Sequence, residues 1–422
     1  MKILIRDVLL DGKRTNILTE GDRIAGIGGV NDRTDAVIDG RGKAAIPGLV
    51  NAHTHAAMSL MRGYADDLPL GEWLSNHIWP LEAKLTPDDV YWGTKLACLE
   101  MIKSGTTCFS DMYWHIESAC RAVEDTGIRG FMSPVFIDQG DSGKAEEHMK
   151  ENTRLAGKAG KKFGGRVKLA LGPHAIYTVS EESLRWAKEH ADKEKLLVHI
   201  HLSETEGEVE DCLKEKGVRP VEYLEKIGFL GPNVVCAHCV WLDQREMRIL
   251  GKNNANAAYC PTSNMKLSVG SALDYDGLRR EGVTVALGTD GCASNNNLDM
   301  FEAMKFASLL QKFHWKSQTA LPAREALMMA TEGGAKALGL EAGSIREGML
   351  ADIALINLKK PELTPNHSLA SDLVYAANGS CVDSLICDGR VLMEKGRVEG
   401  EEKILEKAME ASKNLACRGN QA

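Results

Sequence analysis

The sequence predicts an α/β protein, a (β/α)8 barrel of the TIM type with a small β-sandwich domain built from both chain ends. Between residues 49 and 347, short β-rich runs alternate with helical stretches, and this alternation is typical of a parallel sheet. The number of such runs, eight, matches the number of units in the barrel. Residues 1–48 and 348–422 instead carry β-rich runs separated by turns, so we expect a second sheet there.

The two chain ends have similar patterns. The first 48 residues contain the runs KILIRDVLL, DRIAGIGG and AVIDGRGKAAIPG without a helix between them, and MLADIALINL and DSLICDGRVLMEKGRV follow the barrel region. Asp-Gly and Lys-Gly turn signals separate these later runs, and residues 400–416 have the pattern of an amphipathic helix. We therefore predict one β-sandwich domain from residues 1–48 and 348–422, ending in that helix, around a barrel of residues 49–347.

The barrel strands are predicted from β-rich runs that end near polar residues. Helices such as 87–105 and 180–195 separate them, as βα units require. The eight expected strands are residues 45–53, 106–111, 130–136, 167–174, 196–202, 234–239, 255–261 and 284–290.

Charge and hydropathy argue against nucleic acid and membrane partners. Lys plus Arg number 51 against 59 Asp plus Glu, a net charge of −8, and no basic run stands out. No signal-peptide-like run and no uncharged stretch of membrane-spanning length is found, so we expect a cytoplasmic protein. The eleven cysteines have no disulfide spacing and are expected to be buried thiols; Cys236 and Cys239 lack a second pair and are weak evidence for zinc.

Ionisable side chains gather at the carboxyl ends of the predicted strands. Barrel active sites are built on that face, so these side chains should converge over one mouth although each alone could be a core residue. They are His53, His55, His174, His201, His238 and Asp290.

The spacing of the first two histidines predicts a metal site. Residues i and i+2 of a strand face the same side, so His53 and His55 can bind one ion, and His201 and Asp290 would complete a shell with a position left for water. His199 is interpreted as an outer contact to this shell or as core packing. Lys168 lies too deep to bridge two metals, which favours one divalent ion.

Two further residues are candidates for proton transfer. Glu204 follows His201 by three positions and could protonate a ring nitrogen, while His238 could accept a proton from the metal-activated water. The alternative for Glu204 is a helix-capping carboxylate in the stretch S-E-T-E.

The chain resembles the amidohydrolase superfamily, and within it the 5′-methylthioadenosine/S-adenosylhomocysteine deaminase and 5′-deoxyadenosine deaminase family. The resemblance runs from PGLVNAHTH through WPLEAK, GPHAIYTVS, HIHLSET, AHCVWL and PTSNMKL to LGTDGCASNNNLDM and GSIREGMLADIALI. It implies four metal ligands, His53, His55, His201 and Asp290, and proton transfer by Glu204, His238 and Asp290. It also implies substrate contacts by Glu82, on both ribose hydroxyls, and by His174, Glu204 and Asp290.

The implied reaction is hydrolytic deamination of the adenine ring of 5′-substituted adenosines to the inosine analogue and ammonia. The ligand set admits zinc, with iron and manganese as alternatives. The family also suggests a homo-oligomer such as a tetramer. Two other hypotheses stay open: another amidohydrolase, such as a guanine deaminase or a triazine chlorohydrolase, and a non-catalytic scaffold with the same fold.

One departure from the family concerns the 5′ substituent. Relatives that use S-adenosylhomocysteine well are similar in carrying arginines after the third strand, whereas this chain has Pro134 and, nearby, only Lys144. A lysine lacks the planar fork that binds a carboxylate with two hydrogen bonds. We therefore expect 5′-deoxyadenosine and 5′-methylthioadenosine to be preferred; Met58, Leu60 and Met61 are candidates for the apolar contact, or for ordinary packing.

Overall fold

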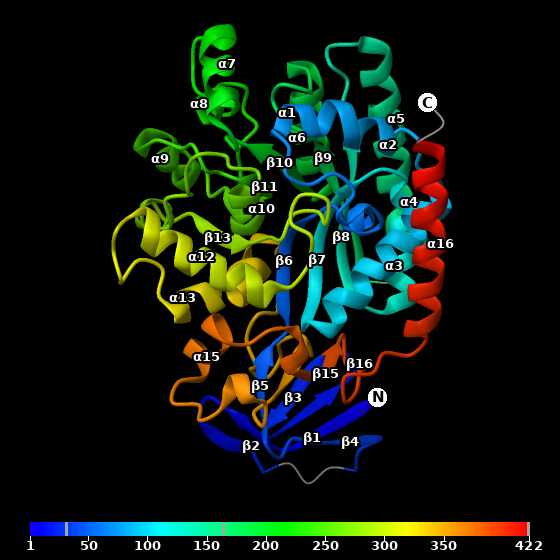
Figure 1. Ribbon diagram of the computed structural model, residues 1–422, viewed down its shortest axis with the longest axis vertical. Coiled ribbons are helices and arrows are strands. Elements are labelled where there is room, and N and C mark those ends of the chain that lie inside the picture. The colour runs from blue at the N-terminus through cyan, green and yellow to red at the C-terminus, as the bar shows by residue number, and fades with distance from the viewer. Residues whose placement is uncertain (30–32, 163–164, 420–422) are drawn as a thin grey trace.

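The computed structural model describes residues 1–29, 33–162 and 165–419. One of its two sheets consists of eight parallel strands that follow one another in chain order, with the helices outside them (Figure 1), which confirms the predicted barrel. The strands are β6 (Leu49–Thr54), β7 (Thr106–Tyr113), β8 (Arg129–Phe136), β9 (Val167–Pro173), β10 (Leu197–Leu202), β11 (Val234–His238), β12 (Asn256–Tyr259) and β13 (Thr284–Leu287).

The predicted first barrel strand, residues 45–53, is divided between the two sheets. Residues Lys43–Pro47 form β5 of the second, mixed sheet, and β6 begins at Leu49. Gly48 lies between them, where an added Cβ would come within 2.2 Å of the Thr107 hydroxyl oxygen. Only glycine fits this passage from one sheet to the other, a constraint that strand periodicity does not reveal.

The barrel is closed between its first and last strands by hydrogen bonds from the Asn51 side chain and the backbone. Asn51 Nδ2 donates to Thr289 Oγ1 at 2.6 Å, and the Thr289 amide donates to Asn51 Oδ1 at 3.0 Å. One residue further, the Asp290 amide donates to the His53 carbonyl at 3.0 Å. This seam holds Asp290 beside His53, although 237 positions separate them (290 − 53).

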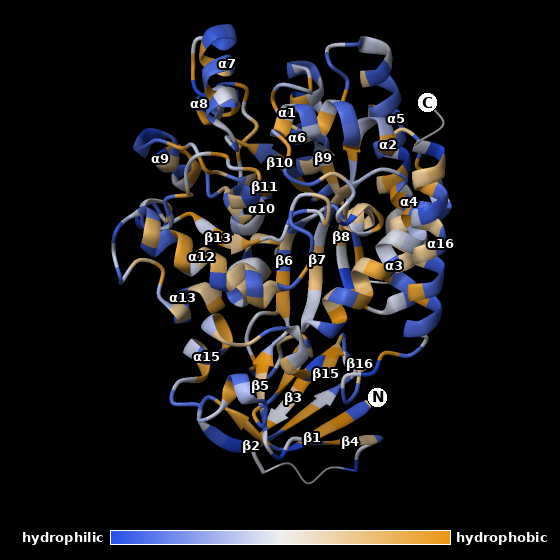
Figure 2. Ribbon diagram, in the orientation of Figure 1, coloured by the Kyte–Doolittle hydropathy of each residue, from blue (hydrophilic) through white to orange (hydrophobic). Residues whose placement is uncertain are grey.

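The helices follow from local sequence signals and cover the barrel. At the start of α3, the Thr86 hydroxyl accepts from the Asp89 amide, and the Asp89 carboxylate accepts from the Thr86 amide. This capping box fixes the first turn of the helix, which begins at Pro87. Figure 2 shows apolar residues concentrated along the strands and polar ones on outlying helices such as α7 and α5. The helices are η1 (Ala56–Met61), α1 (Leu70–Glu72), η2 (Trp73–Ile78), α2 (Trp79–Glu82), α3 (Pro87–Lys103), α4 (Ile116–Thr126), α5 (Ser142–Lys162), α6 (Glu181–Glu194), α7 (Glu206–Lys216), α8 (Pro220–Lys226), α9 (Gln244–Lys252), α10 (Pro261–Lys266), α11 (Tyr275–Arg280), α12 (Met300–His314), α13 (Ala323–Met328), η3 (Met329–Gly333), α14 (Gly334–Ala337), η4 (Pro361–Leu363), α15 (Leu369–Tyr375), η5 (Gly379–Cys381) and α16 (Glu401–Gly419).

Both chain ends build the second, mixed sheet, as predicted. Its strand order is β16-β15-β14-β5-β1-β2-β3, with β4 paired to β1. Arg129 of the barrel connects the two sheets through buried ion pairs with Asp352 (3.2 Å) and Asp388 (2.9 Å). The division of the chain into domains at residues 48/49 and 347/348 stays a prediction. The strands are β1 (Lys2–Leu10), β2 (Lys13–Glu20), β3 (Arg23–Ile27), β4 (Ala36–Asp39), β5 (Lys43–Pro47), β14 (Ile353–Asn357), β15 (Val382–Cys387) and β16 (Arg390–Met393).

The predicted C-terminal helix is α16, which lies along α3 in Figure 1. Its Ser412 hydroxyl donates to the Leu60 carbonyl at 2.8 Å. Across the described residues, no helix combines the length and apolar character needed to cross a membrane. All eleven cysteines are unpaired, and only Cys417 is exposed, in agreement with the expected buried thiols.

Candidate active site

The predicted site residues converge at the carboxyl ends of the barrel strands. They line a pocket with about 750 Å³ of empty space. His53 lies next to these residues and is fully buried. The predicted residues that line the pocket are His55, Glu82, His174, His201, Glu204, His238 and Asp290.

Ring nitrogens and one carboxylate oxygen form a compact cluster in this pocket. The Nε2 atoms of His55 and His201 lie 3.3 Å apart, and Asp290 Oδ1 lies 3.3 Å from His55 Nε2 and 3.5 Å from His53 Nε2. His53 Nε2 is buried and has no hydrogen-bond partner. Three imidazole nitrogens with one carboxylate are a donor set that binds Zn²⁺, and an unpartnered buried nitrogen fits such an ion.

The second nitrogen of each ring determines which atom faces the cluster. His55 Nδ1 lies 2.7 Å from the Met112 carbonyl, and His201 Nδ1 lies 2.7 Å from the His174 carbonyl. Because a carbonyl only accepts, both Nδ1 atoms carry the proton and both Nε2 atoms present a lone pair to the cluster. This arrangement is characteristic of metal-binding histidines.

His199 supports the third ring. Its Nε2 lies 2.8 Å from His53 Nδ1, and its Nδ1 lies 3.1 Å from the Ser110 hydroxyl. The side chain is 1% exposed. His199 is therefore both packed in the interior and bonded to His53, so its two interpretations are compatible.

Asp290 is held as a carboxylate with a defined orientation. Its Oδ2 accepts from the hydroxyls of Ser263 (2.6 Å) and Ser294 (2.9 Å), which leaves Oδ1 toward the histidines. Burial alone would raise the pKa of Asp290, but His53 and His55 hold it well below the ordinary value.

Asp290 and His238 both have positive φ angles, 64° and 72°. Such backbone strain in residues other than glycine is concentrated at functional sites.

Glu204 and His238 form an acid–base pair over the cluster. Glu204 Oε1 lies 3.7 Å from His238 Nδ1, which also contacts Asn264 Nδ2 at 3.0 Å. Burial raises the pKa of Glu204 to about 8, and Asp290 adds to this effect. Burial lowers the pKa of His238 to about 4. At neutral pH the pair therefore consists of a carboxylic acid and a neutral imidazole, one able to donate a proton and the other able to accept one.

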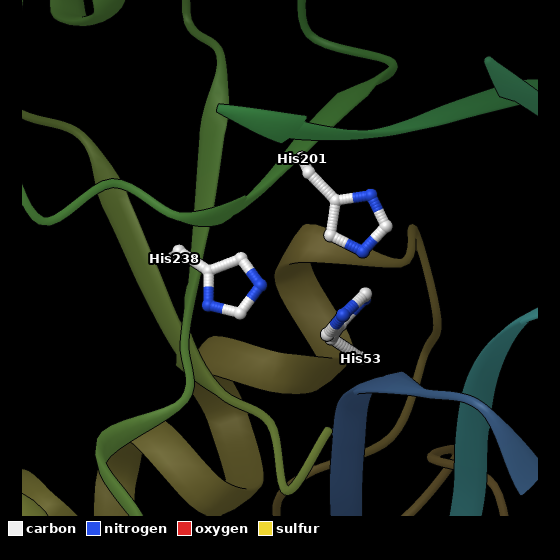
Figure 3. Close-up of side chains that lie close together, drawn as sticks. All are labelled: His53, His201 and His238. Atoms are coloured by element: carbon white, nitrogen blue, oxygen red, sulfur yellow. The ribbon is translucent and has the colours of Figure 1, made fainter. Parts of the chain in front are cut away.

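His238 also lies within reach of the ion position. Figure 3 shows the rings of His53, His201 and His238 turned toward one another, and one donor atom from each lies within 4.8 Å of the others. His53, His55 and Asp290 form a second such group. Among the described residues, neither group contains Cys236 or Cys239, the pair with weak sequence evidence for zinc.

The capping alternative for Glu204 does not hold. Helix α7 begins at Glu206, and its N-cap is Thr205, whose hydroxyl accepts from the Glu208 amide at 3.2 Å. The Glu204 side chain points instead into the pocket, which it lines. Four polar residues in succession, Ser203 to Glu206, left this choice open in the sequence.

Residues 70–82 form a wall of the pocket that sequence reasoning missed, apart from Glu82. A π-helix, η2, carries Trp73 and Ile78 against the pocket, and α2 then brings Glu82 to it. Burial raises the pKa of Glu82, while Tyr113 and His55 act in the opposite direction. The signal available in the sequence was the apolar content of LGEWLSNHIWPLE, which indicates a segment that packs on the barrel. The π-helix itself, a feature often found at functional sites, is visible only in the structure.

The residues considered for the 5′ end of the substrate lie in different places. Met58 lines the pocket, whereas Leu60 and Met61 are buried without lining it, so the packing alternative holds for these two. Pro134 and Lys144 line a neighbouring cavity of about 2210 Å³ empty space. The two cavities share residues Trp79, Glu82, Tyr113, Trp114, Val135 and Ile137.

A barrel with these donor groups at its strand ends defines the chain as a hydrolase that uses a divalent metal. Residues 44–392 match the model described as the amidohydrolase family, and the chain belongs to that family. It is 52% identical over 382 residues to 5′-deoxyadenosine deaminase of Methanoregula boonei, covering 90% of this chain and 86% of the relative. It is 49% identical over 417 residues to 5-methylthioadenosine/S-adenosylhomocysteine deaminase 1 of Archaeoglobus fulgidus, covering 98% and 97%.

A solved structure has the same fold over nearly the whole length. An adenosine deaminase from Xanthomonas campestris with bound zinc superposes with a TM-score of 0.91 at 30% identity, covering 98% of each chain. The predicted family and fold are therefore confirmed.

Proposed function

We propose that this chain deaminates 5′-substituted adenosines, with 5′-deoxyadenosine and 5′-methylthioadenosine preferred over S-adenosylhomocysteine. The products are the inosine analogue and ammonia. The observation that carries the proposal is the position of Glu204 and His238, 3.7 Å apart, beside the cluster of ring nitrogens and the Asp290 carboxylate. The names of relatives at about half sequence identity support the substrate class.

One divalent ion would be held by His53, His55, His201 and Asp290. The zinc bound in the related adenosine deaminase structure supports zinc as the identity of this ion. When bound, the metal lowers the pKa of water and so supplies a nucleophile at neutral pH. A single ion is favoured because Lys168, at the opposite end of β9, lies over the Phe131 ring.

The proton transfers follow from the two pKa shifts. Glu204 donates its proton to N1 of the adenine, which makes C6 electrophilic, and His238 accepts a proton from the attacking water. A C6–O bond forms, and the C6–N bond then breaks as the proton on His238 leaves with the amino group as ammonia. The proton on N1 stays in the product. The new hydroxyl group on C6, which lies beside Asp290, passes its proton to Glu204 and so restores the acid form of Glu204.

Residues of the pocket wall would bind the substrate. Glu82 would accept hydrogen bonds from both ribose hydroxyls, and His174, whose Nδ1 bonds the Thr178 hydroxyl at 2.9 Å, would provide a further contact. Trp73 and Ile78 line the same pocket and offer apolar surface to the nucleoside. Charged hydrogen bonds of this kind select a riboside over a free base.

The test is ammonia release from a panel of compounds by the purified, metal-loaded protein. The panel contains 5′-deoxyadenosine, 5′-methylthioadenosine, S-adenosylhomocysteine, adenosine, guanine and a chlorotriazine. We expect the first two to give the highest kcat/KM. Preferred turnover of guanine or release of chloride would support the rival amidohydrolase activities, and a metal-free, inactive protein would support the scaffold hypothesis.

We also propose that the protein is cytoplasmic, as expected from its sequence, and that it is a homo-oligomer, as the family resemblance suggests. Light scattering coupled to size-exclusion chromatography measures the oligomeric state directly, and a monomer at micromolar concentration would contradict it.

A further inference from the structure

Glu208 of α7 has a buried carboxyl group that the proposed reaction does not use. It is 8% exposed. Its Oε1 accepts from the Ser203 amide at 2.8 Å, and its Oε2 accepts from the Glu204 amide at 2.9 Å. Two successive amides that converge on the oxygens of one carboxyl group form a backbone nest. The nest lies where strand β10 ends and Glu204 enters the pocket.

These hydrogen bonds differ from those of an ordinary capping box. Thr205 is the N-cap of α7, so Glu208 occupies the third helical position, where a glutamate normally accepts from the N-cap amide. Here the carboxylate instead takes the amides of the two residues before Thr205. The helix start is already satisfied by the Thr205 hydroxyl, so the bonds of Glu208 act on the segment that carries Glu204.

The backbone at this point is strained and connected to the His238 strand end. Ser203 has a φ of 48°, a conformation that residues other than glycine rarely adopt. The Ser203 carbonyl accepts from the amides of Val240 (3.0 Å) and Trp241 (2.9 Å), just after His238. The Glu208 carboxylate thus holds a turn that is bonded to the strand end bearing the proton acceptor.

We infer that Glu208 is a positioning residue for proton transfer, because its carboxylate holds the Ser203–Glu204 turn that aims Glu204 at the substrate. The inference rests on the proposed function of Glu204. A displacement of about 1 Å of a reacting group can cost about 100-fold in rate. Loss of the nest should therefore lower kcat, whereas KM, to which Glu82 and His174 also contribute, and metal content should change little.

The experiment compares Glu208→Gln and Glu208→Ala with Glu206→Gln, a matched control in the same helix turn whose side chain is exposed. Glu208→Gln keeps the size but places an amide NH2 against one backbone N–H. We expect kcat for 5′-deoxyadenosine to fall about 10-fold in Glu208→Gln and up to about 100-fold in Glu208→Ala, with KM within about twofold. Glu206→Gln should match the wild type.

Metal analysis and thermal unfolding of each variant separate positioning from loss of the fold. If Glu208→Ala does not fold, the isosteric Glu208→Gln carries the test. Unchanged kcat in folded Glu208→Gln, or an increase in KM alone, would overturn the inference. Glu204→Gln is measured in parallel: full activity there would overturn the proposed role of Glu204, whereas an inactive Glu204→Gln with an active Glu208→Gln would overturn only the role of Glu208.

Discussion

Replacing Pro134 by arginine should increase the use of S-adenosylhomocysteine without changing the use of 5′-deoxyadenosine. Pro134 is half-buried on β8 and lines the cavity that adjoins the proposed ribose site at Glu82. An arginine there could form a two-pronged ion pair with the homocysteine carboxylate, which Lys144 cannot do. 5′-Deoxyadenosine has no carboxylate, so it gains nothing from the new charge.

The size of the effect follows from the exposure of the position. A hydrogen bond to a charged group is worth about 1.5 to 3 kcal/mol when buried, and an exposed ion pair about 0.2 to 1 kcal/mol. Pro134 lies between these limits, so we expect about 1 to 2 kcal/mol. That corresponds to an increase of about 5- to 30-fold in kcat/KM for S-adenosylhomocysteine.

The assay is ammonia release at low salt with both substrates, and Pro134→Gln is the matched control because it also adds a long side chain but no charge. The gain should shrink as ionic strength rises. An equal gain in Pro134→Gln, or no gain in Pro134→Arg when the variant is folded and active on 5′-deoxyadenosine, would refute the assignment of this cavity to the homocysteine group.

The remaining predictions concern the metal and the proton donor. His55→Ala should lose both bound metal and activity while far-UV circular dichroism stays unchanged, since the barrel core lies beneath the site; stoichiometric metal in this variant would exclude His55 as a ligand. Glu204→Gln should lower kcat by about 100-fold or more with metal retained, and near-normal turnover would contradict its role as the acid. Because burial raises the pKa of Glu204 to about 8, the acid form is present below that pH, and kcat should fall as pH rises through about 8; a flat profile from pH 7 to 9.5 would oppose this assignment.

Most of the proposed metal cluster could be predicted from local pattern. His53 lies near the end of β6 and His55 follows directly after this strand, while His201 lies near the end of β10 and Asp290 follows β13. Because the carboxyl ends of parallel strands meet at one mouth, a list of strand-end residues is already a list of neighbours. Strand boundaries were less predictable: nothing in the run AIPGLVNAH marks Gly48 as the point where the chain passes between sheets.

Glu82 illustrates the opposite case. Its place in the site was implied only by family resemblance, because the path of residues 70–82 depends on packing over the barrel and not on any strand position. Trp73 and Ile78 of this segment are buried against the pocket, and their burial positions the carboxyl group of Glu82.

By itself, the sequence determined the barrel, the sheet from both chain ends, and the set of histidines and acids at one mouth, because periodicity and spacing are local properties of the chain. Only the tertiary structure decided which atoms of those residues meet. The Asn51–Thr289 seam brings Asp290 to His53, carbonyls on other strands orient His55 and His201, and burial separates the pKa values of Glu204 and His238. These properties depend on groups far apart in the chain, whose approach is set by closure of the barrel.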